Sequence, residues 1–184
     1  MSDGRMLNVV NEEDEVIGEE TREKVHQDGL LHREIHIFFI TPQKEIILQH
    51  RAKDKDTYPD LLDATVGGHV EIGDDYISTA VKEAKEETGF DIDKEKLVLL
   101  KKMRKETFDN VTGLTNNTIR SQYGYLYEGN IDDLEVEEGK AIGFEAWNID
   151  KLKNLTDQEK ERLIPVLLEE EYMNLFEDLK KLCI

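Results

Sequence analysis

Residues 67–90 read GGHVEIGDDYISTAVKEAKEETGF, and the prediction of the fold starts from this stretch. Its second half carries carboxylates at positions 83, 86 and 87, a spacing that places side chains together on one face of a helix. Like charges repel one another there, and a bound cation removes that repulsion. The spacing therefore predicts a helix that presents Glu83, Glu86 and Glu87 to a divalent metal. A solvated acidic helix face is the alternative interpretation.

The same segment has an apolar side and marked ends. Its apolar residues recur at helical spacing and predict a face that packs on a sheet: Ile77, Ala80, Val81 and Ala84. Asp74 and Asp75 suit the positive N-terminal end of a helix, and Gly89 suits the left-handed residue that follows the last turn. We therefore expect a helix with one dry face and one acidic face.

Two glycines precede this helix and follow an apolar run at residues 61–66. Gly67 and Gly68 suit a backbone that turns tightly or approaches a ligand closely. The carbonyl of Gly67 is our candidate for a backbone ligand to the metal. Oxygen ligands of this kind, carboxylates with a carbonyl, are those that Mg²⁺ prefers.

These residues resemble the box of the Nudix hydrolases, G-x5-E-x7-R-E-U-x-E-E-x-G-U, in which U is apolar. Residues 68–90 match its spacing from Gly68 through the three glutamates to Gly89 and Phe90. Two positions depart, since Asp74 replaces a glutamate and Lys82 replaces an arginine. Both replacements keep the charge, although a lysine cannot form the bidentate fork of an arginine with a carboxylate.

The resemblance implies a fold and a reaction. The fold is a single α/β domain over residues 1–184, an α/β/α sandwich with a mixed sheet between helical layers, and residues 156–182 form a C-terminal helical segment. The reaction is hydrolysis of the pyrophosphate bond in a nucleoside diphosphate linked to another group, or in a similar diphosphate, with Mg²⁺ or Mn²⁺ as cofactor. Glu83 and Glu87 are then metal ligands, and Glu86 is a ligand or the base. Glu83 and Glu86 are the catalytic candidates, and the spacing leaves open which removes the proton.

Further site residues are expected outside the box. A basic group at Arg51, Lys53 and Lys55 is our candidate for binding the substrate's phosphates, with a solvated loop as the alternative. The resemblance also implies a further carboxylate near residues 137–144, and we expect Glu138 rather than Glu137 to supply it. An acidic loop without such a role is the alternative there.

Within this family the chain resembles the subgroup that includes isopentenyl-diphosphate isomerase, which makes that isomerase the main rival. The isomerase carries a cysteine two residues before the histidine of the glycine loop, where this chain has Gly67 before His69. It also carries paired glutamates where this chain has asparagines at 116 and 117. His32 and His69 match histidines that bind metal in the isomerase, and His26 lies close to a third. For these histidines we expect a structural role, with metal binding as the alternative. A module that keeps the fold and lacks catalysis is a third hypothesis.

Composition narrows the partners. The net charge of −18 disfavours nucleic acid and anionic lipid, because both require basic surfaces. No apolar run approaches the length of a membrane span, and the first residues lack the basic and apolar parts of a signal peptide. Cys183 is the one cysteine and cannot form an internal disulfide. We therefore expect a cytoplasmic monomer or homodimer that acts on a small-molecule diphosphate, with the leaving group not identified.

The rest of the chain has strand and helix patterns. Strands are expected at residues 6–10, 32–40, 45–51, 97–104, 119–127 and 143–147, with a loop at residues 107–117. Helices are expected from Thr156 to Leu163 and from Pro165 to Leu182, the second of them amphipathic. Trp147 is expected in the core. Three tyrosines at 123, 125 and 127 share one strand face and line a cleft or pack under a helix.

Overall fold

The computed structural model describes residues 4–55 and 57–183, and within these ranges nine strands form one sheet. The strands are β1 Met6–Val10, β2 Val16–Thr21, β3 His32–Ile40, β4 Glu45–Arg51, β5 Leu62–Asp63, β6 Val66–His69, β7 Val98–Phe108, β8 Thr115–Leu126 and β9 Ala141–Asn148. The helices are α1 Arg22–Asp28, α2 Tyr76–Thr88, α3 Ile149–Leu152, α4 Asp157–Lys160 and α5 Glu170–Leu179. Short 3₁₀ turns occur at η1 Lys94–Lys96, η2 Ile131–Asp133, η3 Pro165–Leu168 and η4 Lys180–Cys183.

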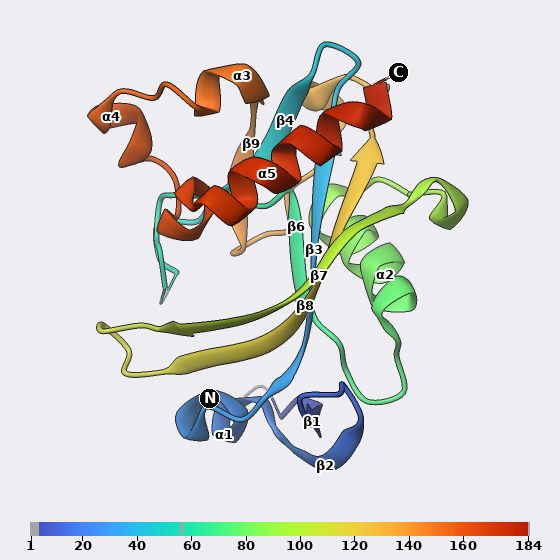
Figure 1. Cartoon of the computed structure of the whole chain (residues 1–184), viewed down its shortest axis with the longest axis vertical. Helices are drawn as coiled ribbons and strands as arrows, with labels where there is room; N and C mark the ends of the chain where they lie inside the picture. The colour runs from blue at the N-terminus through green and yellow to red at the C-terminus, as the bar shows by residue number, and fades with distance from the viewer. Residues whose placement is uncertain (1–3, 56, 184) are drawn as a thin grey trace.

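Strand β3 is the centre of the sheet. It pairs antiparallel with β1, β4 and β6 and parallel with β8, so the sheet is mixed as predicted. Strands β7 and β8 form a long hairpin, and β9 pairs with β4. Because β3 contacts β6 and β8 directly, it holds the glycine loop at the middle of the molecule (Figure 1).

Alternation along β3 divides the core between two helical layers. Ile35, Ile37 and Phe39 pack with the box helix α2, whereas Phe38 and Ile40 pack with α5. In Figure 1, α5 crosses β3 and β4, while α2 lies apart from it across the strands. The expected sandwich is confirmed.

Helix α2 begins and ends where its sequence predicts. Asp75 is the N-cap and forms a capping box with Ser78, and Gly89 follows the last turn with φ of 68°. The predicted apolar face needs a correction, because Ile77 is 38% exposed. Ala80 and Ala84 are fully buried instead, together with two of the glutamates. The buried face of the helix therefore includes Glu83 and Glu87 as well as the two alanines.

The C-terminal segment is more broken than expected. Thr156 caps a helix as predicted, but that helix, α4, is one turn long and ends at Lys160 rather than Leu163. The expected single helix from Pro165 to Leu182 is wrong. Pro165 opens the short turn η3, and the extended backbone of Glu169 separates it from α5. The amphipathic face of α5 covers the sheet.

Two further expectations are resolved. The loop expected at residues 107–117 is shorter and covers residues 109–114, because β7 continues to Phe108 and β8 begins at Thr115. Trp147 is a core residue, and the tyrosines of β8 pack in the apolar cluster beneath α2. In the described part of the chain no helix combines the length and the apolarity that crossing a membrane requires.

Candidate active site

Two of the three box glutamates are buried together on α2. Glu83 is 7% exposed and Glu87 5% exposed, whereas Glu86 points outward into solvent. Residues four apart are neighbours on a helix, so the two buried carboxylates lie one turn from each other. Burial of two like charges is costly unless a cation or a proton accompanies them.

The glycines of β6 allow the close approach of these carboxylates. A Cβ atom at Gly68 would lie 2.5 Å from Cδ of Glu83, so only glycine fits under that side chain. A Cβ atom at Gly67 would lie 3.3 Å from the ring of His36 on the other side of the strand. The glycine pair thus brings the backbone against α2, as the sequence predicts.

Glu87 is held by donors from the sheet. Its Oε2 atom accepts hydrogen bonds from the backbone N–H of Gly67 and from Nε2 of Gln49, each at 3.2 Å. These bonds aim the carboxylate at the glycine loop. The backbone of Gly67 is therefore at the site, although it is its N–H, and not its carbonyl, that makes this contact.

A lysine occupies the space between the acids. Nζ of Lys140 lies 3.5 Å from Oε1 of Glu87, 3.9 Å from Oε2 of Glu83 and 2.7 Å from Oε2 of Glu137. Glu83, Glu87, Glu137 and Lys140 are hereafter called the acidic cluster. The ammonium group is a cation, and it lies at a point that three carboxylates share.

The carboxylate of Glu137, from beyond the box, lies beside Lys140. Lys140 and Ala141 both donate their N–H groups to the carbonyl of Glu137, which closes a turn through Gly139 at φ of 77°. This turn directs the side chain of Glu137 to Lys140 and leaves Glu138 exposed. The structure thus brings Glu137, the alternative residue, to the cluster, while a metal-binding role for Glu138 stays a prediction.

The electrostatics of the cluster favour a bound cation. Burial raises the pKa of Glu87 to about 7, even though Lys140 opposes the shift. Burial also raises the pKa of Glu83. For Lys140, burial lowers the pKa, but the three carboxylates outweigh it and the pKa rises. A single ammonium does not neutralise three carboxylates, so the donor set of the cluster fits a divalent metal.

The structure separates the three basic residues proposed for the substrate. Arg51 donates to Asp63 at 2.9 Å and to the carbonyls of Thr57 and Tyr58, so its guanidinium braces the loop that follows β4. Lys53 is exposed. Lys55 is half-buried, and burial, with Arg51 and Lys140 nearby, lowers its pKa. Of the three, Lys55 is the one beside the acidic cluster.

A second group of possible ligands lies elsewhere. His26 of α1, His32 of β3 and His69 of β6 bring ligand atoms within 4.8 Å of one another, and these three residues are hereafter called the histidine cluster. Nε2 of His26 is 3.2 Å from Nε2 of His69. Burial lowers the pKa of all three, so they are neutral at pH 7. From the sequence a structural role is expected, because a lone histidine before a strand is usually structural, with metal binding as the alternative that the match to the isomerase implies.

Backbone carbonyls orient two of these rings. Nδ1 of His26 lies 2.7 Å from the carbonyl of Arg22, and Nδ1 of His32 lies 2.9 Å from that of Leu30. Since a carbonyl only accepts, both Nδ1 atoms donate, and each Nε2 keeps its lone pair. Nε2 of His32 and Oδ1 of Asn116 are both buried, and neither has a hydrogen-bond partner among the described residues. Metal-binding histidines commonly donate the other ring nitrogen to a carbonyl in this way, which fixes the orientation of the ring.

The two clusters lie on opposite faces of β6. In its antiparallel pairing with β3, Gly68 stands opposite Ile35, which faces α2, and His69 stands opposite Glu34. Neighbouring residues of a strand point to opposite sides, so the acids lie on the α2 side and the histidines on the other. The adjacent residues Gly68 and His69 of β6 therefore face different sites, the carboxylates on one side of the strand and the imidazoles on the other.

A buried ionic network continues from the histidines towards α5. Nε of Arg120 donates to Glu34 at 2.7 Å, and its Nη1 donates to the hydroxyl of Tyr172 at 2.8 Å. Nε2 of Gln122 donates to the same hydroxyl at 2.9 Å. Burial opposes ionisation of Glu34, but Arg120 holds its pKa well below the usual range. The interior on this face therefore contains a charged pair, Glu34 and Arg120, beside neutral polar groups.

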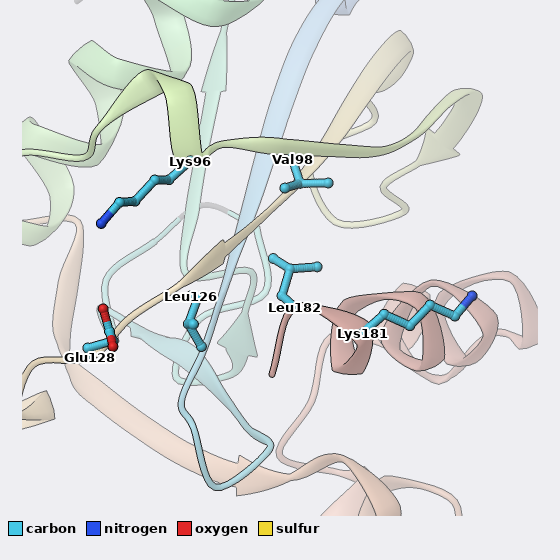
Figure 2. Close-up of a pocket in the computed structure, with 6 residues that line it drawn as sticks. All are labelled: Lys96, Val98, Leu126, Glu128, Lys181 and Leu182. Carbon is cyan, nitrogen blue, oxygen red and sulfur yellow. The ribbon is translucent and has the colours of Figure 1, made fainter. Parts of the chain in front are cut away.

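A surface pocket near the C-terminus is separate from both clusters. Figure 2 shows it between β8 and the last turn of the chain, lined by Lys96, Val98, Leu126, Glu128, Lys181 and Leu182. No box carboxylate is among these lining residues. We therefore assign the site to the acidic cluster and not to this pocket.

Fold and site together define a class: an α/β sandwich whose glycine loop and helix bring buried carboxylates together. The family model for the NUDIX domain matches residues 30–167, which is most of the chain and includes both clusters except His26. The chain belongs to the Nudix family.

Relatives of known sequence agree with this. The chain is 27% identical over 167 residues to "Nudix hydrolase 3" of Arabidopsis thaliana, covering 88% of this chain and 21% of that protein. It is 27% identical over 153 residues to an isopentenyl-diphosphate Delta-isomerase of Serratia proteamaculans, covering 83% and 80%. It is 39% identical over 83 residues to the Nudix hydrolase YfcD of Escherichia coli, covering 45% of this chain and 46% of that one. The chain thus spans well under two thirds of the plant protein and of YfcD.

Solved structures share the fold. The structure of DR0079 from Deinococcus radiodurans superposes with a TM-score of 0.65 at 20% identity, over 95% of this chain and 98% of that one. The MutT protein of Methanosarcina mazei gives a TM-score of 0.61 at 15% identity, over 82% and 94%. At such identities the likeness concerns the fold alone.

Proposed function

We propose that the chain is a metal-dependent hydrolase of diphosphate linkages in small molecules. The observation that carries this proposal is the burial of Glu83 against Gly68 and of Glu87 against the N–H of Gly67, with the Lys140 ammonium near both carboxylates. A helix face with a purely structural role would leave such carboxylates in solvent. Membership of the Nudix family supports the same reaction.

The residues of the acidic cluster divide the work. Glu83 and Glu87 hold Mg²⁺ or Mn²⁺, with Glu137 as a third carboxylate and the carbonyl of Gly67 as the backbone candidate. A bound cation supplies neutralisation of the diphosphate and acidifies water. Glu86, exposed on the same helix, is the candidate to accept the proton of the attacking water, with Glu83 as the alternative base. Glu138, which is exposed beside Glu137, remains the other candidate for the further carboxylate.

Basic residues next to the cluster complete the site for an anionic substrate. Lys55 lies near both Lys140 and Glu87 and is our candidate for a phosphate oxygen. Arg51 shapes the loop that carries Lys55, through its bonds to Asp63 and to two carbonyls. Lys53 extends from the same loop into solvent, where it adds positive potential for an approaching anion.

Isomerisation of isopentenyl diphosphate is the second candidate, because one relative carries that name over 80% of its length. Two positions oppose it. Gly67 offers no thiol, and its missing Cβ faces the ring of His36. Asn117 donates to the carbonyl of Gly29 at 3.0 Å, so it is used as a structural amide. Neither position provides the acid or base that moving a double bond requires. A binding module without catalysis is opposed by the intact buried pair of glutamates.

The histidine cluster is proposed as a second cation site. In His26 and His32 the Nδ1 atom donates to a backbone carbonyl and leaves Nε2 for a metal, and imidazole nitrogens suit Zn²⁺ or another transition metal better than Mg²⁺. Its donor set differs from the acidic cluster, so the two sites would take different metals.

The test is a panel of small-molecule diphosphates with Mg²⁺ or Mn²⁺, with phosphate and pyrophosphate release measured and isopentenyl diphosphate followed by NMR. The hydrolase proposal expects cleavage of at least one member, lost in Glu87→Gln. Isomerisation without cleavage would replace it with the second candidate. Tight binding of a member that is neither cleaved nor isomerised would favour the binding module.

A further inference from the structure

The starting observation is the position of Lys140 inside the acidic cluster. Its backbone is fixed at both ends, since its N–H donates to Glu137 at 3.0 Å and its carbonyl accepts from Ala52 at 3.0 Å. The side chain is 28% exposed, compared with 9% for Glu83 and 6% for Glu87. The four-carbon stem of a lysine is flexible, so the ammonium can leave the cluster while its backbone stays in place.

The ammonium and a divalent cation require the same oxygens. Lys140 contacts Oε2 of Glu83 and Oε1 of Glu87, the two side chains that the proposed function assigns to the metal. Two cations a few ångströms apart repel strongly in a partly buried site. Entry of the metal therefore requires the ammonium to move outward.

The substrate provides a place for the displaced ammonium. A diphosphate bound to the metal places anionic oxygens at the solvent side of the cluster, which is the side from which Lys140 is accessible. Half-buried Lys55 also lies near the cluster, with Lys140, Glu87 and Glu137 as its charged neighbours. The displaced ammonium of Lys140 beside Lys55 would complete the contact with a diphosphate.

We propose that Lys140 occupies the metal position in the free protein and moves onto the substrate's diphosphate when the metal enters. This inference rests on the proposed function and adds a coupling to it. Metal binds weakly to the free protein because it must displace Lys140. Metal and diphosphate then bind cooperatively, and each strengthens the other by the same factor.

The experiment measures Mn²⁺ binding to the full chain by electron paramagnetic resonance of the free ion, with and without imidodiphosphate, a diphosphate that resists hydrolysis. A protein-free titration corrects for Mn²⁺ held by imidodiphosphate itself. The proteins are the wild type, Lys140→Met, Lys140→Arg and Glu87→Gln. Lys85→Met is the matched control, because Lys85 lies on the exposed side of α2, paired with Asp91 at 2.7 Å.

The expected result is that Lys140→Met binds Mn²⁺ alone on the order of tenfold more tightly than the wild type does. Imidodiphosphate should raise the Mn²⁺ affinity of the wild type by at least about tenfold and that of Lys140→Met by much less. Lys140→Arg should retain the competition, since it keeps the charge. Lys85→Met should match the wild type, which excludes an effect of net charge alone.

Two results would overturn the inference. If Lys140→Met binds Mn²⁺ no more tightly than the wild type, while Glu87→Gln loses binding, the metal site stands and the role of Lys140 is wrong. If the wild type and Lys140→Met both fail to bind Mn²⁺ in the presence of imidodiphosphate, the proposed function fails as well.

Discussion

Gly68 and Glu83 are in contact across the interface between β6 and α2, at a distance that excludes any side chain at position 68. A Cβ atom there would lie 2.5 Å from Cδ and 2.6 Å from Cγ of Glu83. The glycine of the loop and the first glutamate of the helix are therefore one structural unit, although 15 positions separate them in the sequence.

The first prediction concerns Gly68→Ala. The added methyl group must displace the Glu83 carboxylate, which is buried and not free to turn aside. We expect a loss of stability of about 1–3 kcal/mol and at least a roughly tenfold loss of metal-dependent activity. Denaturant titration and the hydrolysis assay measure the two effects. Gly143→Ala is the control, because no atom lies within 4 Å of its Cβ position. Equal behaviour of the two variants would contradict the steric account.

The second prediction concerns Glu87 and pH in the metal-free protein. Its folded pKa of about 7 lies above the unfolded value of 4.5, so the folded state binds the proton more tightly. The contribution of Glu87 to the free energy of unfolding is therefore fully present below pH 4.5. It is lost as the pH rises through 7, by on the order of 1–3 kcal/mol. Relative to the wild type, Glu87→Gln should gain stability between pH 5 and 8 in the presence of a chelator.

Thermal unfolding at several pH values checks this difference directly. Buried histidines titrate in the same range with the opposite sign, and the comparison of two proteins removes their shared contribution. Glu86→Gln removes a carboxylate from the exposed side of the same helix and should not reproduce the gain. A stability difference between Glu87→Gln and the wild type that does not change with pH would contradict the burial of a charged Glu87.

The third prediction concerns the histidine cluster. Co²⁺ added to the full chain should give the visible absorption of a low-coordinate nitrogen site, and His69→Asn should lose it. His50→Asn is the matched control, because His50 pairs with Asp60 at 2.9 Å, outside the cluster. Retention of the absorption in His69→Asn, or its absence in the wild type, would leave the three histidines with the structural role that the sequence suggested.

The fourth prediction concerns the ion pair of Glu34 and Arg120. Arg120→Met leaves a buried carboxylate without its partner and should cost about 3–5 kcal/mol in the free energy of unfolding. Adding Glu34→Gln to that variant should recover a large part of the loss, because the unpaired charge is then removed. Denaturant titration of both variants tests this. A double variant no more stable than Arg120→Met would show that packing, and not charge, dominates at this position.

Local spacing was sufficient to predict α2, its caps and the two glutamates, because the residues that matter lie within one helix turn of each other. The choice between Glu137 and Glu138 depends on the turn through Gly139, which local composition does not reveal. The histidine cluster joins three elements whose proximity exists only after β6 pairs with β3. The sequence does not show the break before α5, because the amphipathic pattern of leucines and glutamates continues on both sides of Glu169.

In the proposed function, buried Glu87 holds the cation on which hydrolysis depends. The most direct measurement is the rate of hydrolysis of the best panel substrate as a function of Mg²⁺ concentration, for the wild type and Glu87→Gln. We predict a rate that requires Mg²⁺ and falls by about a hundredfold or more in Glu87→Gln at every Mg²⁺ concentration. A rate that is independent of Mg²⁺, or one within about threefold of the wild type in Glu87→Gln, would contradict the account.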